Sequence, residues 1–93
     1  MVDYLIVGAG LYGAVFAQAA TARGKRCLVV EKRPHIGGNL YTETVEGIEV
    51  HRYGAHIFHT SNQTVWDYMS LFTDWIPFIN SPLARFGDEL YNL

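Results

Sequence analysis

The sequence predicts an α/β fold that begins with a parallel β-α-β unit. Residues 4–7 and 26–30 are short, continuous apolar runs of the kind that forms central strands. Between them, the alanine-rich residues 11–22 have high helix propensity. Such a crossover is almost always right-handed and places its two strands parallel. Only 17% of the 93 residues are charged, against roughly 25% in soluble domains, which favours strands buried on both faces.

The end of the helix and the second strand are also marked in the sequence. Gly24 follows Arg23, a combination typical of a helix C-terminus. Cys27 lies inside the second apolar run and is expected to be a small core residue. Because it is the single cysteine, an internal disulfide and a multi-cysteine metal site are excluded.

Residues 40–72 predict a hairpin followed by a helix. Residues 40–45 and 48–53 flank Glu46-Gly47 and are typical of two strands joined by a tight turn. Thr60 and Gln63 fit a capping box, with Thr60 as the N-cap. Apolar side chains at helical spacing follow and are expected to face a core: Val65, Met69 and Phe72.

Three further strands are predicted after this helix. Apolar runs at 75–79 and 83–86 are read as strands, and Gly87-Asp88 turns the chain into a last strand at 90–93. A complete dinucleotide-binding domain usually contains five or six strands, and only two parallel ones are evident here. Residues 1–93 are therefore expected to be the N-terminal piece of a longer protein.

A glycine motif joins the first strand to the helix. Residues 8–13 read Gly-Ala-Gly-Leu-Tyr-Gly, the G-x-G-x-x-G pattern in its required strand-to-helix context. Gly8 permits the tight turn, Gly10 lets a pyrophosphate approach the backbone, and Gly13 lets the helix pack closely on the sheet. Free N–H groups and the helix dipole favour phosphate there. A glycine turn without a ligand is the plainer alternative.

An acid and a second glycine pair narrow the choice of cofactor. Glu31 ends the second strand, where a carboxylate accepts the adenosine ribose hydroxyls and repels a 2′-phosphate. A solvated acid is the alternative interpretation. Gly37-Gly38 lets the backbone run close to a second phosphate or a ribityl chain. This arrangement resembles flavoproteins of the glutathione-reductase and amine-oxidase types, so FAD is expected and NAD stays the alternative.

The four histidines give weaker indications. No H-E-x-x-H pattern occurs, and no metal site is expected. His35 is interpreted as a loop residue without a ligand contact, and His51 as a surface or satisfied strand residue. His56 and His59 flank Ile57-Phe58, and from the residues alone either is only a candidate for catalysis.

Four segments, in the same order, closely resemble the bacterial UDP-galactopyranose mutase family: residues 3–14, 31–39, 53–60 and 80–84. The first two are shared by many flavoproteins, whereas the last two are more specific. The resemblance implies a Rossmann-like FAD-binding fold of the glutathione-reductase and amine-oxidase type. Residues 1–93 would be its N-terminal part, with the remainder absent from this chain.

The resemblance also implies an activity. The family interconverts UDP-galactopyranose and UDP-galactofuranose, a precursor of bacterial surface polysaccharides, without net redox change. Reduced FAD is the active form, and its N5 attacks the anomeric carbon and displaces UDP. UDP-galactose and UDP-galactofuranose are thus the expected partners. The arginines that neutralise UDP are expected beyond residue 93, so the isolated piece is expected to be inactive.

Site residues carried over from the family fall into three groups. The cofactor-binding positions are Gly8, Gly10, Leu11, Gly13, Glu31, Lys32, Gly38, Asn39 and His56. The resemblance places His56 beside the isoalloxazine ring and the backbone of Ala55 opposite N5, and both are expected to be catalytic. His59 and Asn80 are weaker substrate-binding candidates.

Charge and hydropathy exclude other classes of partner. The net charge of -2 without a basic cluster argues against nucleic acid. No apolar run approaches the ~20 residues of a membrane helix. The first residues lack the basic region of a signal peptide, so a cytoplasmic location is expected. The full-length form could be a homodimer. Two alternatives stay open: a flavin oxidoreductase of the amine-oxidase type, and a nucleotide-binding or inactive structural fragment.

Overall fold

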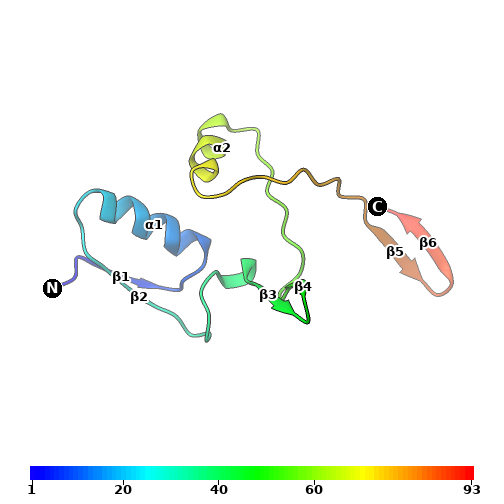
Figure 1. The fold of residues 1–93 in the computed structure, drawn as a ribbon, viewed down its shortest axis with the longest axis horizontal. Coiled ribbons are helices and arrows are strands. Elements are labelled where there is room, and N and C mark those ends of the chain that lie inside the picture. The colour runs from blue at the N-terminus through cyan, green and yellow to red at the C-terminus, as the bar shows by residue number, and fades with distance from the viewer. The chain divides into compact units, whose positions relative to one another are not determined.

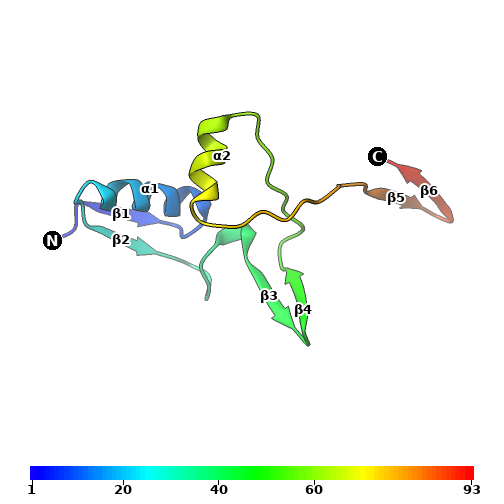
Figure 2. The ribbon, with the colours of Figure 1, turned by 45° about the horizontal axis from the view of Figure 1, so that its top comes forward.

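The computed structural model describes all residues from 1 to 93 and divides into two compact units, residues 1–56 and 57–93. The first unit opens with β1 (Tyr4–Val7), α1 (Leu11–Ala22) and β2 (Cys27–Val30) (Figure 1). The strands pair in parallel, with Tyr4 opposite Cys27 and Val7 opposite Val30. Figure 2 shows α1 running alongside this strand pair. The predicted β-α-β unit is confirmed.

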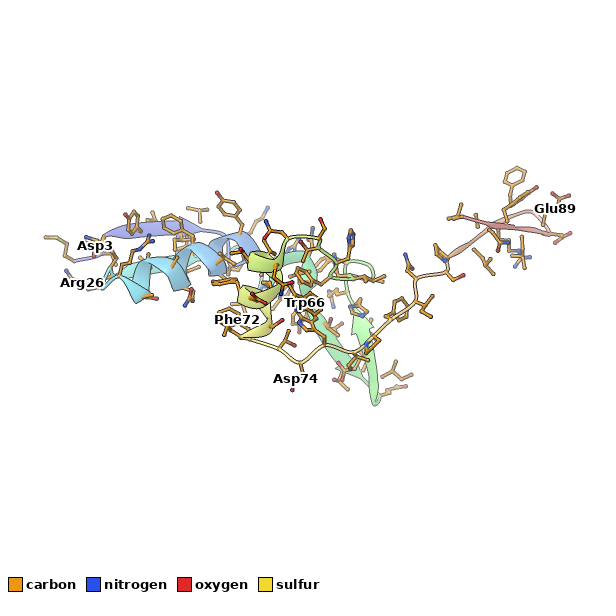
Figure 3. The ribbon with its side chains drawn as sticks, turned by 90° about the horizontal axis from the view of Figure 1, so that it is seen from above. Asp3, Arg26, Trp66, Phe72, Asp74 and Glu89 are labelled. Atoms are coloured by element: carbon orange, nitrogen blue, oxygen red, sulfur yellow. The ribbon has the colours of Figure 1, made fainter.

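A side chain fixes the start of the strand pair. The Arg26 N–H donates to Asp3 Oδ2 at 2.8 Å, while the Asp3 N–H donates to the Arg26 carbonyl at 2.8 Å. Figure 3 labels both residues where the two strands begin. This reciprocal pair sets the register of β1 against β2 from the end opposite the glycine motif.

The core of the first unit is small. Ile6 and Ala20 are the buried apolar residues, each 9% exposed, and the Tyr4 ring meets Phe16 edge-on at 5.1 Å. The prediction of strands buried on both faces is wrong for these residues, because a single helix covers the pair. Successive side chains of a strand point to opposite faces. Val7, next to the buried Ile6, therefore lies on the uncovered face and is 80% exposed. Cys27 is only half-buried.

The predicted hairpin forms, with shorter strands. After a short 3-10 turn η1 (Gly38–Leu40), β3 (Thr42–Val45) pairs antiparallel with β4 (Ile48–His51). Glu46 and Gly47 both have positive φ, 52° and 80°, as a two-residue turn that follows the strand twist requires. The hydroxyl of Thr42 lies 3.1 Å from His51 Nδ1, so His51 is a satisfied surface residue, as expected.

The second unit contains α2 (Gln63–Ser70) and a hairpin of β5 (Leu83–Phe86) and β6 (Glu89–Asn92). The predicted capping box is wrong by two residues. Asn62 is the N-cap, and its Oδ1 accepts the Val65 N–H at 3.2 Å, while Thr60 Oγ1 accepts the Asn62 N–H at 3.0 Å. Asn is as good an N-cap as Thr, and it lies adjacent to the first helical residue.

Two other predictions for the second unit are wrong. Residues 75–79 form no strand, since Pro77 lacks a ladder donor and no strand is paired with them. The apolar stripe of α2 is not core: Val65 is 41% and Phe72 57% exposed. Instead, three stacked rings gather beside the helix, with centroids 4.7 to 5.9 Å apart, and Figure 3 labels Trp66 among them. They belong to Phe58, Trp66 and Trp75.

No helix in the structure is long and apolar enough to cross a membrane.

Candidate dinucleotide-binding site

The glycine turn is built so that α1 starts directly against the end of β1. The Gly8 N–H donates to the Val30 carbonyl at 2.8 Å, and Gly8 has φ +104°, a conformation that side chains disfavour. A Cβ on Gly13 would lie 2.3 Å from the Gly8 carbonyl oxygen and 3.1 Å from Ile6 Cγ2. Only glycine at position 13 therefore permits this close approach of helix and turn.

The first turn of α1 offers its amides to a ligand. Gly10 is the N-cap and supplies no side chain, and the first turn carries no acidic residue. The Ala14 N–H donates to the Gly10 carbonyl at 3.0 Å, so the N–H groups ahead of it have no partner within the helix. Together with the positive end of the helix dipole, they favour an anion such as a pyrophosphate.

A second loop, residues 31–39, lies against the glycine turn. The Gly37 N–H donates to the Ala9 carbonyl at 2.8 Å. A Cβ on Gly38 would lie 3.0 Å from Gly10 Cα, so the two backbones meet at van der Waals distance. Gly37 and Gly38 also have positive φ, 97° and 58°. The bare backbone of Gly37-Gly38 therefore lies directly against the glycine turn, while its predicted approach to a second phosphate or a ribityl chain stays a prediction.

The Glu31 carboxylate joins the two loops. Its Oε1 accepts the Ala9 N–H at 2.8 Å, and its Oε2 accepts the Arg33 N–H at 2.7 Å. These two backbone donors, with smaller contributions from the charges of Arg33 and His35, lower the pKa of Glu31 below its usual value. Each carboxylate oxygen has a further lone pair, so the group is still able to accept ribose hydroxyls.

Sequence reasoning missed the residues that hold the loop from outside. The guanidinium of Arg33 lies over the Tyr53 ring, 4.1 Å from its centroid, and its Nη1 donates to Asn39 Oδ1 at 3.0 Å. His35 stacks on Tyr41 with ring centroids 3.8 Å apart. Tyr53 lies well beyond the loop in the sequence, and no motif signals the pairing. Tyr53 comes close to this loop only because the hairpin reverses the direction of the chain.

Among the other predicted site residues of the first unit, Ala55 and His56 make no contact with this cluster. Lys32 is exposed, as are Ala55 and His56, which follow the hairpin without regular structure. His56 has no hydrogen bond or ring contact. His59 and Asn80 belong to the second unit and are also exposed. Within residues 1–93, no group of three or more His, Cys, Asp or Glu side chains could hold a metal ion.

A parallel β-α-β unit with a glycine turn, free helix amides and an acid at the tip of the second strand defines a Rossmann-like dinucleotide-binding domain. The family model for the NAD(P)-binding Rossmann-like domain matches residues 6–72, and the chain belongs to this family.

Curated relatives match over nearly the whole chain. It is 37% identical over 93 residues to a probable UDP-galactopyranose mutase of Klebsiella pneumoniae, covering 98% of this chain and 24% of the relative. It is 46% identical over 92 residues to the UDP-galactopyranose mutase of Mycoplasma genitalium, covering 97% of this chain and 22% of that relative. It is 37% identical over 91 residues to a dTDP-fucopyranose mutase of Escherichia coli, covering 96% of this chain and 24% of that relative.

These matches confirm the resemblance to UDP-galactopyranose mutases, and the similarity is to their N-terminal part. The chain spans about a quarter of the length of the curated relatives it matches.

Proposed function

We propose that these residues are the N-terminal, cofactor-holding part of an FAD-dependent UDP-galactopyranose mutase. The observation that carries the proposal is the contact between the two loops: Gly38 against Gly10, and Glu31 against Ala9. A glycine turn alone serves many dinucleotides. A second glycine loop packed on it extends the bare backbone surface, as a cofactor with a long ribityl-phosphate arm needs.

The residues present fit such a cofactor. At Gly8, a Cβ would meet nothing within 4 Å, so the space over the turn is open to a phosphate. The free amides of the first turn of α1, including that of Leu11, would bind the pyrophosphate, and Glu31 would accept the ribose hydroxyls. Lys32, Gly38 and Asn39 would follow the cofactor along the second loop.

The proposed chemistry divides between cofactor and protein. Bound and reduced, FAD would supply the nucleophile that lets the sugar ring open and reclose without net oxidation. The protein's own task would be to orient and to exclude water. Ala55 and His56 are proposed to lie beside the flavin ring, and His59 and Asn80 beside the nucleotide sugar. Their exposure leaves these side chains accessible, and the similarity to the mutases supports their assignment.

The test uses the full-length protein that carries this segment. It is expected to purify with bound FAD and, after reduction with dithionite, to convert UDP-galactofuranose to UDP-galactopyranose without consuming oxygen. A protein that retains no FAD, or that oxidises an amine instead, would contradict the proposal. Equilibrium dialysis with NAD provides the comparison with the other dinucleotide.

The role of His56 has its own test. His56→Ala is expected to keep bound FAD but to lose mutase turnover, because the residue lies outside the loops that hold the adenosine end. His51→Ala is the matched control, since His51 is a surface residue bonded to Thr42. Undiminished turnover of His56→Ala would remove this residue from the active site.

A further inference from the structure

Tyr53 contacts the second loop from outside, at two points. Its ring lies under the guanidinium of Arg33, 4.1 Å from ring centroid to Cζ, and its hydroxyl lies 2.8 Å from His35 Nε2. Tyr53 comes after β4, so these contacts connect the hairpin's end to a loop that precedes the hairpin. They are the side-chain contacts that join residues 33–35 to the chain beyond β4.

Arg33 transmits this contact to both ends of the loop. Its backbone N–H donates to Glu31 Oε2 at 2.7 Å, and its Nη1 donates to Asn39 Oδ1 at 3.0 Å. Glu31 in turn holds the Ala9 N–H, and Asn39 follows Gly38, which touches Gly10. Holding Arg33 in place therefore supports the contacts that both ends of the loop make with the glycine turn.

His35 provides a second attachment between the loop and Tyr53. Its Nδ1 lies 3.0 Å from the Ile36 carbonyl oxygen, which can only accept, so Nδ1 carries the proton. In the neutral imidazole Nε2 then accepts a hydrogen bond from the Tyr53 hydroxyl, and in the imidazolium it donates one to the same oxygen, so the two side chains are joined in either state. The stacking of His35 on Tyr41, with the ring planes 9° apart, prevents the imidazole from turning away.

We propose that Tyr53 is a positioning residue for the dinucleotide: through Arg33 and His35 it holds the loop of residues 31–39 in its ligand-ready form. The proposal rests on the proposed function, because it concerns the same cofactor site. Tyr53 itself makes no contact with the glycine turn of residues 8–13. It acts by reducing the conformational freedom that the loop would otherwise lose when the cofactor binds.

The first experiment measures FAD dissociation constants for the reconstituted full-length protein. Tyr53→Phe removes the bond to His35 but keeps the ring under Arg33, and we expect a roughly threefold to tenfold weaker affinity. Tyr53→Leu removes both contacts, and we expect a loss of about tenfold to fiftyfold. Tyr91→Phe is the control, because it removes a tyrosine hydroxyl bonded to Glu89 in the other unit.

The second experiment separates positioning from a general loss of stability. If Tyr53 acts through Arg33, the effects of Tyr53→Leu and Arg33→Met are not additive. The double variant should then bind FAD within about twofold of the weaker single variant. Purely additive losses, or a Tyr53→Leu variant with wild-type affinity, would overturn the proposal. Should Tyr53→Leu not fold, unchanged affinity of Tyr53→Phe decides against it.

The outcomes distinguish this inference from the proposed function. The dissociation constants can be measured without turnover. A protein that binds FAD but does not isomerise UDP-galactose therefore refutes the mutase activity, while the FAD affinities of the Tyr53 and Arg33 variants still test this inference. If FAD does not bind, the same series is run with NAD. A wild-type protein that binds neither dinucleotide overturns both.

Discussion

In residues 1–56, side-chain hydrogen bonds join segments far apart in the sequence, whereas the side-chain hydrogen bonds of residues 57–93 join near neighbours. In the first unit, Glu31 bonds to Ala9 and Arg26 to Asp3. In the second unit, Asn62 caps its own helix, and the Trp75 indole donates to Ser70 Oγ at 2.8 Å.

This difference explains where a binding site can form from this chain alone. Long-range contacts bring separate segments to one place, and the two loops at the end of the β1–β2 pair are the result. Local contacts build a helix and a hairpin, and their polar pairs, such as Gln63 with Asp67, stay within one element. The second unit accordingly presents exposed apolar side chains, such as Ile76 at 89% and Ile79 at 90%, and no comparable polar cluster.

The largest effect is expected at Gly13. In Gly13→Ala the new Cβ would lie 2.3 Å from the Gly8 carbonyl oxygen, so helix and turn must separate. We expect a loss of about 1–3 kcal/mol of stability, typical of overpacking, together with loss of FAD retention. Thermal unfolding and the flavin absorbance of the purified protein measure the two effects.

Ala19→Ser is the control for this substitution, since Ala19 is an exposed residue of the same helix. It should retain FAD at the wild-type level. If Gly13→Ala also retains FAD at that level, the close packing of α1 on the turn is not needed for binding.

The next effect concerns the charge of Glu31. Glu31→Gln keeps the shape of the side chain, but one of its two terminal atoms becomes a donor that faces a backbone N–H. Because both carboxylate oxygens accept such groups, we expect FAD to bind at least about tenfold more weakly. Titration of the apoprotein checks this. Asp67→Asn in α2 is the control, and equal affinity of wild type and Glu31→Gln would show that another group holds the loops.

A smaller, pH-dependent effect follows from the lowered pKa of Glu31. A carboxyl whose pKa is lower in the folded state stabilises that state above its unfolded pKa, and the stabilisation is lost as the pH falls through the folded value. The difference in unfolding free energy between wild type and Glu31→Gln should therefore be largest near neutral pH and shrink in acid. A difference that grows in acid would reverse the sign and contradict the assigned bonds.

The smallest effect is expected in the second unit. Asn62→Ala removes the helix cap and should cost about 1 kcal/mol of stability, while FAD affinity stays unchanged. Chemical denaturation and FAD titration measure the two quantities. Thr60→Ala is the comparison, because Thr60 bonds only to the Asn62 N–H and should cost less. A weakened FAD affinity in Asn62→Ala would mean that the two units are coupled.

The sequence is sufficient for elements whose determinants are local. The bounds of α1 follow from its alanines and from Gly24, and the hairpin turn follows from Glu46-Gly47, where backbone conformation selects the residues. It is not sufficient for Pro77 and its neighbours, where apolar residues suggest a strand but nothing is there to pair with them.

The candidate site divides in the same way. The glycine motif is recognisable because its spacing reflects one backbone turn, and Glu31 is recognisable because it follows the second strand directly. Two contacts could not be predicted from spacing: the bond between Glu31 and Ala9, and the contact of Tyr53 with Arg33. Each depends on how the folded chain brings distant segments together. The positions of Ala55, His56, His59 and Asn80 relative to a cofactor stay predictions.

The central claim is that the two loops of residues 8–13 and 31–39 together hold the adenosine and diphosphate end of FAD. A crystal structure of the full-length protein with FAD tests it most directly. We expect the pyrophosphate over the amides of the glycine turn, the adenosine ribose hydroxyls on Glu31, and the Glu31 to Ala9 bond still in place. A flavin bound elsewhere, or Glu31 turned into solvent beside an occupied turn, would contradict the account.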